Sequence, residues 1–282
     1  MFTSVKQRLP DAIIIGTKKS GTSFLSSVAQ LHSRLAMRLP EIHFFDTPNQ
    51  TDPELYRTMM KSSFQDQVTM DKTPKYWITQ SAPNAIKEIN PKIKLILILR
   101  DPACRLCSDF HHEKRVSKIT EESFEDFALD LKNEDIMDFI VEPSRYDVHM
   151  KNWLRSFPLS QFYIIRGEDM YNPKTLSPIL RGLEEFLGIP YEFMVLQKGD
   201  INCVTTPWQA GFGENSSSIC WPSKNSGELC QYDRQYSIIL DVYRRLLNTH
   251  VQEFERITQQ NFYWPNGEYS EEVSNLARFN DR

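Results

Sequence analysis

The sequence has no apolar run that approaches the roughly 20 residues a helix needs to span a bilayer. Its N-terminus, Met1–Pro10, is polar and lacks the apolar core of a signal peptide. We therefore expect neither a membrane span nor a targeting segment in this chain. Two alternatives follow: a cytosolic protein, or a soluble part of a longer protein whose membrane attachment would need a segment absent from this chain.

The sequence also has no excess of basic residues, since 33 Lys and Arg stand against 37 Asp and Glu and the formal net charge is −4. This balance argues against nucleic-acid binding, so an anionic partner would have to be recognised by a local cluster of cations. No group of His, Cys and Asp has the spacing of a metal site, and we expect no metal. With 282 residues, 40% of them hydrophobic, the chain can bury a substantial core as one domain.

The most informative stretch that is present covers residues 12–25, where an apolar strand ends at Gly16 and a helix begins near Gly21 after two lysines. Backbone N–H groups at a helix start are unpaired and lie at the positive end of the helix dipole, so such a loop binds a phosphate-like anion. The glycine spacing fits a nucleoside-triphosphate loop, but Thr22 stands where that loop has lysine. The alternative is that these are ordinary turn and capping residues.

A second group of ionisable residues lies in the largely apolar segment 39–46, which contains Glu41, His43 and Asp46. In an extended chain Glu41 and His43 would project to the same side. A carboxylate beside an imidazole in a partly buried segment can have its proton affinity tuned toward that of a general base. The alternative is a half-buried edge strand with solvated polar positions.

Cations follow two further predicted strands. Lys72 and Lys75 come at the end of a short strand, where an α/β sheet places its ligand contacts. Arg100 directly follows a buried apolar run, and together with Ser108 on the next helix it could bind a second phosphate. The alternatives are that the lysines are solubilising loop charges and that Arg100 pairs only with Asp101.

Apolar patterns typical of strands and helices alternate along the chain. This alternation predicts an α/β fold with a mostly parallel central sheet and helices on both faces. Residues 191–232 lose the periodicity, so we expect an irregular, cysteine-containing loop that needs a cross-link or a ligand for stability. Besides the strand before Gly16, we expect strands at 94–99 and 161–166 and helices at 22–31, 82–90, 144–157, 173–187 and 233–260, followed by a polar tail at 265–282.

Five motifs occur in one order along the chain. They are the loop at 16–22, Glu-Ile-His-Phe-Phe-Asp46, Asp-Lys-Thr-Pro-Lys-Tyr76, Leu-Ile-Leu-Arg-Asp-Pro102 with Ser108, and His-Met-Lys-Asn-Trp-Leu-Arg-Ser-Phe-Pro158. In this order and spacing they resemble the heparan sulfate glucosamine 3-O-sulfotransferases, over about residues 10–264.

The resemblance implies a P-loop-like sulfotransferase fold and a single catalytic domain over 1–282. It implies transfer of a sulfuryl group from 3′-phosphoadenosine 5′-phosphosulfate (PAPS) to a glycosaminoglycan, with 3′-phosphoadenosine 5′-phosphate (PAP) as product. The expected acceptor is the 3-hydroxyl of glucosamine in heparan sulfate. Family enzymes are anchored in the Golgi lumen, which we expect as the location, although this chain contains no anchor.

The resemblance also implies which residues form the site. Glu41 would be the base, Lys19, Lys72 and His43 the other catalytic residues, and Cys203 with Cys220 the family's disulfide. Residues implied at the sugar are Glu41, His43, Asp46, Lys72 and Lys75. Those implied at the nucleotide are Lys18, Lys19, Ser20, Gly21, Thr22 and Ser23 at the phosphosulfate, Arg100 and Ser108 at the 3′-phosphate, and Lys198, Gly199 and Lys224 from the cysteine loop.

Four departures from the family pattern leave the acceptor open. Ser23 stands where the family has Arg, Ser20 replaces the first of two glycines, Asp200 replaces an aromatic, and Asn-Ser follows Lys224 in place of Gly-Arg. The alternatives are a different glycan acceptor or a non-catalytic glycan-binding homologue. Cys230 is left over, free or competing for the bridge, and sequons begin at Asn49 and Asn215.

Overall fold

The structure is a computed structural model that describes residues 4–116, 124, 128, 141–207, 218–222 and 236–265. The chain divides into two compact units, the first formed by 1–99 and 153–229 and the second by 100–152 and 230–282. The expectation of a single catalytic domain over the whole chain stays a prediction.

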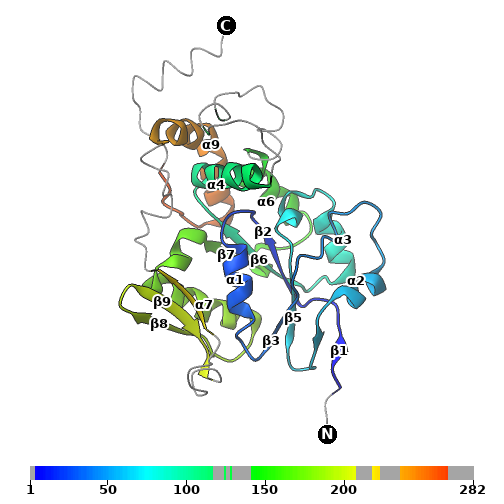
Figure 1. Cartoon of the computed structure of the whole chain (residues 1–282). Helices are drawn as coiled ribbons and strands as arrows, with labels where there is room; N and C mark the ends of the chain where they lie inside the picture. Colours follow the sequence, from blue (N-terminus) through cyan, green and yellow to red (C-terminus); the bar gives the residue numbers. More distant parts are fainter. Residues whose placement is uncertain are drawn as a thin grey trace. The chain divides into compact units, whose positions relative to one another are not determined.

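A five-stranded parallel sheet forms the centre of the first unit (Figure 1). Side chains alternate between the faces of a strand, and both sets are fully buried here: Ile14 and Ile96 on one face, Ile13 and Leu95 on the other. Both faces are therefore covered, which confirms the predicted α/β fold. The strand order is β3 (Leu35–Met37), β5 (Val68–Lys72), β2 (Ala12–Gly16), β6 (Lys94–Leu99) and β7 (Phe162–Arg166).

Helices connect these strands, as the sequence patterns predict. The helices α1 and α7 contribute Leu25, Val28, Leu180 and Leu183 to one apolar cluster with the sheet. Asn172 caps the start of α7 by accepting a hydrogen bond from the N–H of Lys174. The helical elements of this unit are α1 (Thr22–Ala29), α2 (Pro53–Met59), α3 (Ala82–Ile89) and α7 (Pro173–Leu187), with 3₁₀ turns η1 (Pro74–Ile78), η4 (Leu159–Gln161) and η5 (Gly167–Tyr171).

A second, antiparallel sheet lies in the segment where we expected an irregular loop, so that expectation was wrong for the described part. Its order is β10 (Ile219–Pro222), β9 (Ile201–Thr205) and β8 (Met194–Lys198). Cys203 and Cys220 are register partners in it and form a disulfide with an S–S distance of 2.11 Å, as predicted. A further antiparallel pair joins β1 (Lys6–Gln7) to β4 (Ser62–Ser63). Lys224, Cys230 and the sequon at Asn215 lie outside the described residues.

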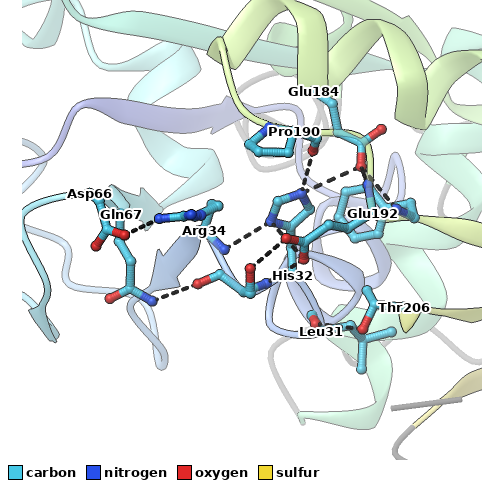
Figure 2. A network of polar contacts seen from close by, with 11 residues as sticks. Leu31, His32, Arg34, Asp66, Gln67, Glu184, Pro190, Glu192 and Thr206 are labelled. Atoms are coloured by element: carbon cyan, nitrogen blue, oxygen red, sulfur yellow. Dashed lines mark hydrogen bonds and ion pairs between the residues drawn. The ribbon is translucent and has the colours of Figure 1, made fainter. Parts of the chain in front are cut away.

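A buried histidine ties the start of β8 to the central sheet (Figure 2). The ring of His32 is fully buried. Its Nδ1 accepts a hydrogen bond from the N–H of Arg34 at 3.0 Å, so the ring proton is on Nε2. Nε2 donates this proton to the carbonyl of Pro190 at 3.0 Å. Glu184, from α7, accepts the N–H of Glu192 at 2.6 Å. These contacts fix the point at which the chain leaves α7 and enters the β8–β9 hairpin.

The described part of the second unit is helical. Its apolar cluster joins Leu106 and Phe110 of α4 to Leu240, Tyr243 and Leu247 of α9. The carboxylate of Asp101 caps α4 through the N–H of Ala103 and pairs with Arg244 at 2.8 Å. Its elements are α4 (Pro102–Arg115), η3 (Glu142–Ser144), the start of α6 (Tyr146–Leu154) and α9 (Ser237–Thr258). In the described parts of both units, no helix combines the length and apolar character needed to cross a membrane.

Candidate active site

The loop between β2 and α1 has the geometry of an anion-binding turn. Its backbone is left-handed at Lys19 (φ 67°) and at Gly21 (φ 104°), which is the N-cap of α1. These two turns bring the chain directly from the strand end into the first helical turn, whose N–H groups lack partners within the helix. The expected position of an oxyanion is therefore the start of α1, beside the two lysines.

Hydroxyl side chains of this loop form hydrogen bonds that stabilise it. Thr17 donates from Oγ1 to the carbonyl of Ile98 at 3.2 Å and lies 2.5 Å from Oγ of Ser20, and both side chains are buried. Thr22 is buried as well, whereas Ser23 is exposed. These contacts join the loop to β6. Ser20 therefore stabilises the loop, in addition to its predicted contact with the phosphosulfate.

Gly167 supports the same loop, and the sequence analysis did not identify it. A Cβ at this position would lie 2.5 Å from the carbonyl oxygen of Ser20 and 3.0 Å from that of Leu99. Both atoms belong to backbone, which cannot turn aside as a flexible side chain can. Only a glycine lets the turn after β7 pack this closely on the loop, and a glycine directly after a predicted strand was the one signal that could have pointed to it.

We expect Gly167→Ala to lower the free energy of unfolding by about 1–3 kcal/mol, the usual cost of forcing an extra carbon into a packed site. Urea titration followed by tryptophan fluorescence measures this change. Gly167→Ser should cost at least as much, because its side chain meets the same two carbonyls. An unchanged urea midpoint in both variants would contradict the close packing.

The ionisable residues of segment 39–46 and of the end of β5 form one continuous cluster. Nζ of Lys72 donates to Oε1 of Glu41 at 2.5 Å, and Oε2 of Glu41 lies 3.2 Å from Nε2 of His43. Nδ1 of His43 lies 2.8 Å from Oδ2 of Asp46, which Nζ of Lys75 approaches at 3.7 Å. The structure therefore brings together all five residues that were predicted to contact the acceptor sugar.

Exposure differs along this cluster in a way that matters for chemistry. The Lys72 and Asp46 side chains are 6% and 3% exposed, whereas Glu41 and His43 are 33% and 47% exposed. The buried members can hold the exposed ones in place. Among the described residues, Oδ1 of Asp46 finds no hydrogen-bond partner although it is buried, which leaves an acceptor for a bound group.

The backbone of this segment differs from the expected extended chain. β3 ends at Met37, the residues from Glu41 to His43 are not part of a strand, and His43 is left-handed with φ 55°. The edge-strand interpretation and the extended conformation were therefore wrong. A left-handed non-glycine residue costs about 1–2 kcal/mol and has to be held by its surroundings, here the fully buried neighbouring Phe44.

The loop and the cluster lie on adjacent elements. β2 and β5 are neighbouring strands, and η1, which carries Lys75, packs on Gly16 at the start of the loop. A Cβ on Gly16 would lie 2.5 Å from Cβ of Trp77 and 3.2 Å from the carbonyl oxygen of Pro74. The glycine therefore allows the two functional segments to approach at the carboxyl ends of the strands, where open parallel sheets bind ligands.

The remaining predicted donor residues lie elsewhere in the chain. Arg100 directly follows β6, and its carbonyl accepts from the hydroxyl of Tyr146 at 2.7 Å; Ser108 lies on α4. Lys198 ends β8, and Gly199 (φ 58°) begins the two-residue turn into β9, a position that favours glycine. The assignment of these four residues to the nucleotide stays a prediction, as does that of Lys18 and Lys19.

Comparison with known proteins agrees with these features. The family model of the sulfotransferase domain matches residues 9–208. Heparan sulfate glucosamine 3-O-sulfotransferase 5 of Mus musculus is 36% identical over 192 residues, covering 65% of this chain and 55% of that protein. Heparan sulfate glucosamine 3-O-sulfotransferase 3A1 of Mus musculus is 34% identical over 187 residues, covering 65% and 47%. This chain spans about half the length of these relatives.

Solved structures show the same fold. A sulfotransferase from Alicyclobacillus acidocaldarius superposes with a TM-score of 0.64 at 18% identity, covering 90% of this chain and 97% of that one. The predicted resemblance is therefore confirmed by sequence, and the predicted fold by structure. The chain belongs to the sulfotransferase domain family.

Proposed function

We propose that this chain transfers a sulfuryl group from PAPS to a hydroxyl of a glycosaminoglycan, namely the 3-hydroxyl of glucosamine in heparan sulfate. One observation carries the proposal: a carboxylate, Glu41, is one-third exposed and held between Lys72 and His43, and Lys72 ends β5, the neighbour of the strand that leads into the loop before α1. The relatives named above support the acceptor, since their names specify 3-O-sulfation of glucosamine in heparan sulfate.

The residues of the loop fit the donor. A phosphosulfate is an oxyanion, and the start of α1 offers backbone N–H groups and a positive dipole end, with Lys19 in the loop itself. PAPS would supply the sulfuryl group. In our proposal Lys18, Lys19, Gly21 and Thr22 bind its phosphate end and stabilise the negative charge that the leaving phosphate acquires.

The residues of the cluster fit the acceptor. Glu41 would take the proton of the sugar hydroxyl while the hydroxyl oxygen bonds to sulfur and the bond from sulfur to the phosphate oxygen breaks, so that PAP leaves. Lys72 holds the Glu41 carboxylate in position and keeps a positive charge beside the reacting group. His43 and Asp46 would orient the sugar, with Oδ1 of Asp46 accepting from a second hydroxyl.

The polyanionic acceptor needs local positive charge, because the chain as a whole carries −4. Lys75, whose side chain is 59% exposed, supplies one such charge next to the cluster. The Cys203–Cys220 disulfide supports an oxidising compartment, and we propose the Golgi lumen as its location.

A second enzyme function keeps the donor and changes the acceptor. Ser23, where the family has arginine, is exposed in the first turn of α1, so a cation that could meet an anionic glycan is missing there. This observation favours a different sulfated or uronic-acid glycan. A binding protein without turnover is the remaining alternative, motivated by the residues that follow Lys224.

The test is transfer of labelled sulfate from PAPS to heparan sulfate, chondroitin sulfate and dermatan sulfate, followed by disaccharide analysis. Label on the 3-oxygen of glucosamine supports the proposal. Label on another position or chain keeps the donor chemistry and overturns the acceptor. Absence of label on every chain, with PAP still bound in calorimetry, would indicate an acceptor outside this panel or the non-catalytic alternative.

A further inference from the structure

A buried polar cluster that none of the predicted roles uses lies beneath the acceptor segment. Asp71, Tyr56, Thr73 and Tyr76 are each fully buried, and they come from β5, α2, the β5–η1 junction and η1. Asp71 precedes Lys72 in the strand, so the two side chains point to opposite sides. A buried carboxylate without a cation partner is costly, and such a group usually has a structural or functional reason.

The carboxylate of Asp71 collects hydrogen bonds from hydroxyl groups. Tyr56 donates to Oδ2 at 3.0 Å, and Thr73 donates to Oδ1 at 3.3 Å. The nearby Tyr76 hydroxyl also favours the ionised form, since it lowers the pKa of Asp71 against the larger effect of burial. Asp71 therefore accepts hydrogen bonds from Tyr56 and Thr73, and Tyr76 is a third hydroxyl that acts on its charge.

Two of these hydroxyls hold the backbone of the acceptor segment. The N–H of Ile42 donates to Oγ1 of Thr73 at 3.3 Å, and the N–H of Phe44 donates to the Tyr76 hydroxyl at 2.9 Å. The two amides stand on either side of His43, and Ile42 directly follows Glu41. Stacking of Phe44 on Tyr56, with ring centroids 4.7 Å apart, anchors the same segment.

The direction of these hydrogen bonds depends on the charge of Asp71. A hydroxyl has one proton, and if it gives that proton to Asp71 its lone pairs remain for the backbone N–H. A protonated Asp71 would itself donate one hydrogen bond, so one of these hydroxyls would have to turn its proton away from the carboxyl. The ionised carboxylate only accepts, and it leaves the lone pairs of Thr73 and Tyr76 to the two amides.

We propose that Asp71 is a positioning residue for sulfuryl transfer: its carboxylate orients the Thr73 and Tyr76 hydroxyls, which fix the backbone that carries Glu41 and His43. This inference rests on the proposed function for its catalytic part, while the structural part stands on the contacts alone.

The pH dependence follows from the same arrangement. Burial raises the pKa of Asp71 to about 6, against the opposing effect of hydrogen bonds from Tyr56, Tyr76 and Thr73. Tyr56 and Tyr76 are the titratable side chains that act on Asp71, and burial raises the pKa of both, so each keeps its proton. Because the folded protein binds this proton more tightly than the unfolded chain, the contribution of Asp71 to stability is greatest below about pH 4, the ordinary range of Asp, and falls as pH rises to about 6.

Residue-level hydrogen exchange tests the structural part of the inference and needs neither PAPS nor a glycan. At pH 7.5 we expect Thr73→Val to speed exchange of the Ile42 amide alone, Tyr76→Phe that of the Phe44 amide alone, and Asp71→Asn that of both. Thr58→Val is the matched control, since Thr58 is exposed and its hydroxyl bonds only within α2, to Leu55. In Asp71→Asn, the loss of stability between about pH 4 and pH 6 should disappear.

Kinetics on the same proteins tests the catalytic part. We expect kcat to fall about 10- to 100-fold in each of the three variants, a range known for small misplacements of reacting groups, with KM for PAPS changed less than about threefold. Unchanged exchange at both amides in Thr73→Val and Tyr76→Phe would overturn the inference, even if Asp71→Asn fails to fold. Altered exchange with unchanged kcat would overturn the catalytic part, whereas an inactive wild-type protein with the expected exchange would count against the proposed function alone.

Discussion

Replacing Glu41 with glutamine is expected to lower kcat for sulfuryl transfer by about 10²- to 10⁴-fold, the range that a positioned general base contributes. Glutamine has the same shape, and its amide oxygen can still accept the hydrogen bond that Lys72 donates to Oε1 at 2.5 Å. It cannot take a proton from the acceptor hydroxyl. The loss should therefore appear in kcat, while KM for PAPS stays close to that of the wild type.

The control for this experiment is Glu88→Gln, the same chemical change at an exposed position on α3. It should leave both activity and thermal midpoint unchanged. Circular dichroism of Glu41→Gln should match the wild type, because one-third of this side chain is already in solvent. A variant that folds and keeps kcat within twofold of the wild type would remove Glu41 from the role of base.

Lys19→Met is expected to weaken PAP binding about 10- to 100-fold, since a hydrogen bond to a charged group contributes about 1.5–3 kcal/mol. Methionine keeps an unbranched side chain and makes the left-handed backbone at this position (φ 67°) no more strained than lysine does. The measured effect then reports the lost ammonium group. Isothermal titration calorimetry with PAP gives the affinity without an acceptor.

A matched lysine, Lys87 on the exposed side of α3, provides the control Lys87→Met, which should bind PAP as the wild type does. Raising the salt concentration should narrow the difference between Lys19→Met and the wild type, because screening weakens the contact that the variant lacks. Equal affinities at low salt would show that the loop does not use Lys19 to bind the nucleotide.

Local sequence was sufficient to predict those strands and helices that do not depend on residues far along the chain. The apolar run Lys94–Leu99 and the helix Pro173–Leu187 have the predicted bounds, because a continuous apolar run buried on both faces and an amphipathic pattern between Pro173 and Gly188 identify such elements directly. The glycines at 16 and 21 likewise mark the strand-to-helix turn. Grouping Glu41, His43, Asp46, Lys72 and Lys75 in one site came from the resemblance, and the structure confirms that they meet.

Other features depend on partners far along the chain. The strands β8 and β9 were missed because they expose apolar side chains such as Leu196 and Ile201, so no buried-to-exposed alternation is visible in the sequence. Their pairing and the disulfide between Cys203 and Cys220 define them. The left-handed backbone of His43 is equally hidden, since the contacts that hold this segment come from residues about 30 positions later.

The sequence by itself determined the alternation of strands and helices in the parallel sheet, the turn from β2 into α1 and the residue types found there, because periodicity and glycine placement act over a few residues. Only the tertiary structure determined which side chains contact one another and how deeply each is buried. Burial raises the pKa of Asp71 to about 6. The carbonyl oxygen of Ser20 leaves no room for a Cβ at Gly167. Burial and close approach are properties of the whole fold, which no local pattern records.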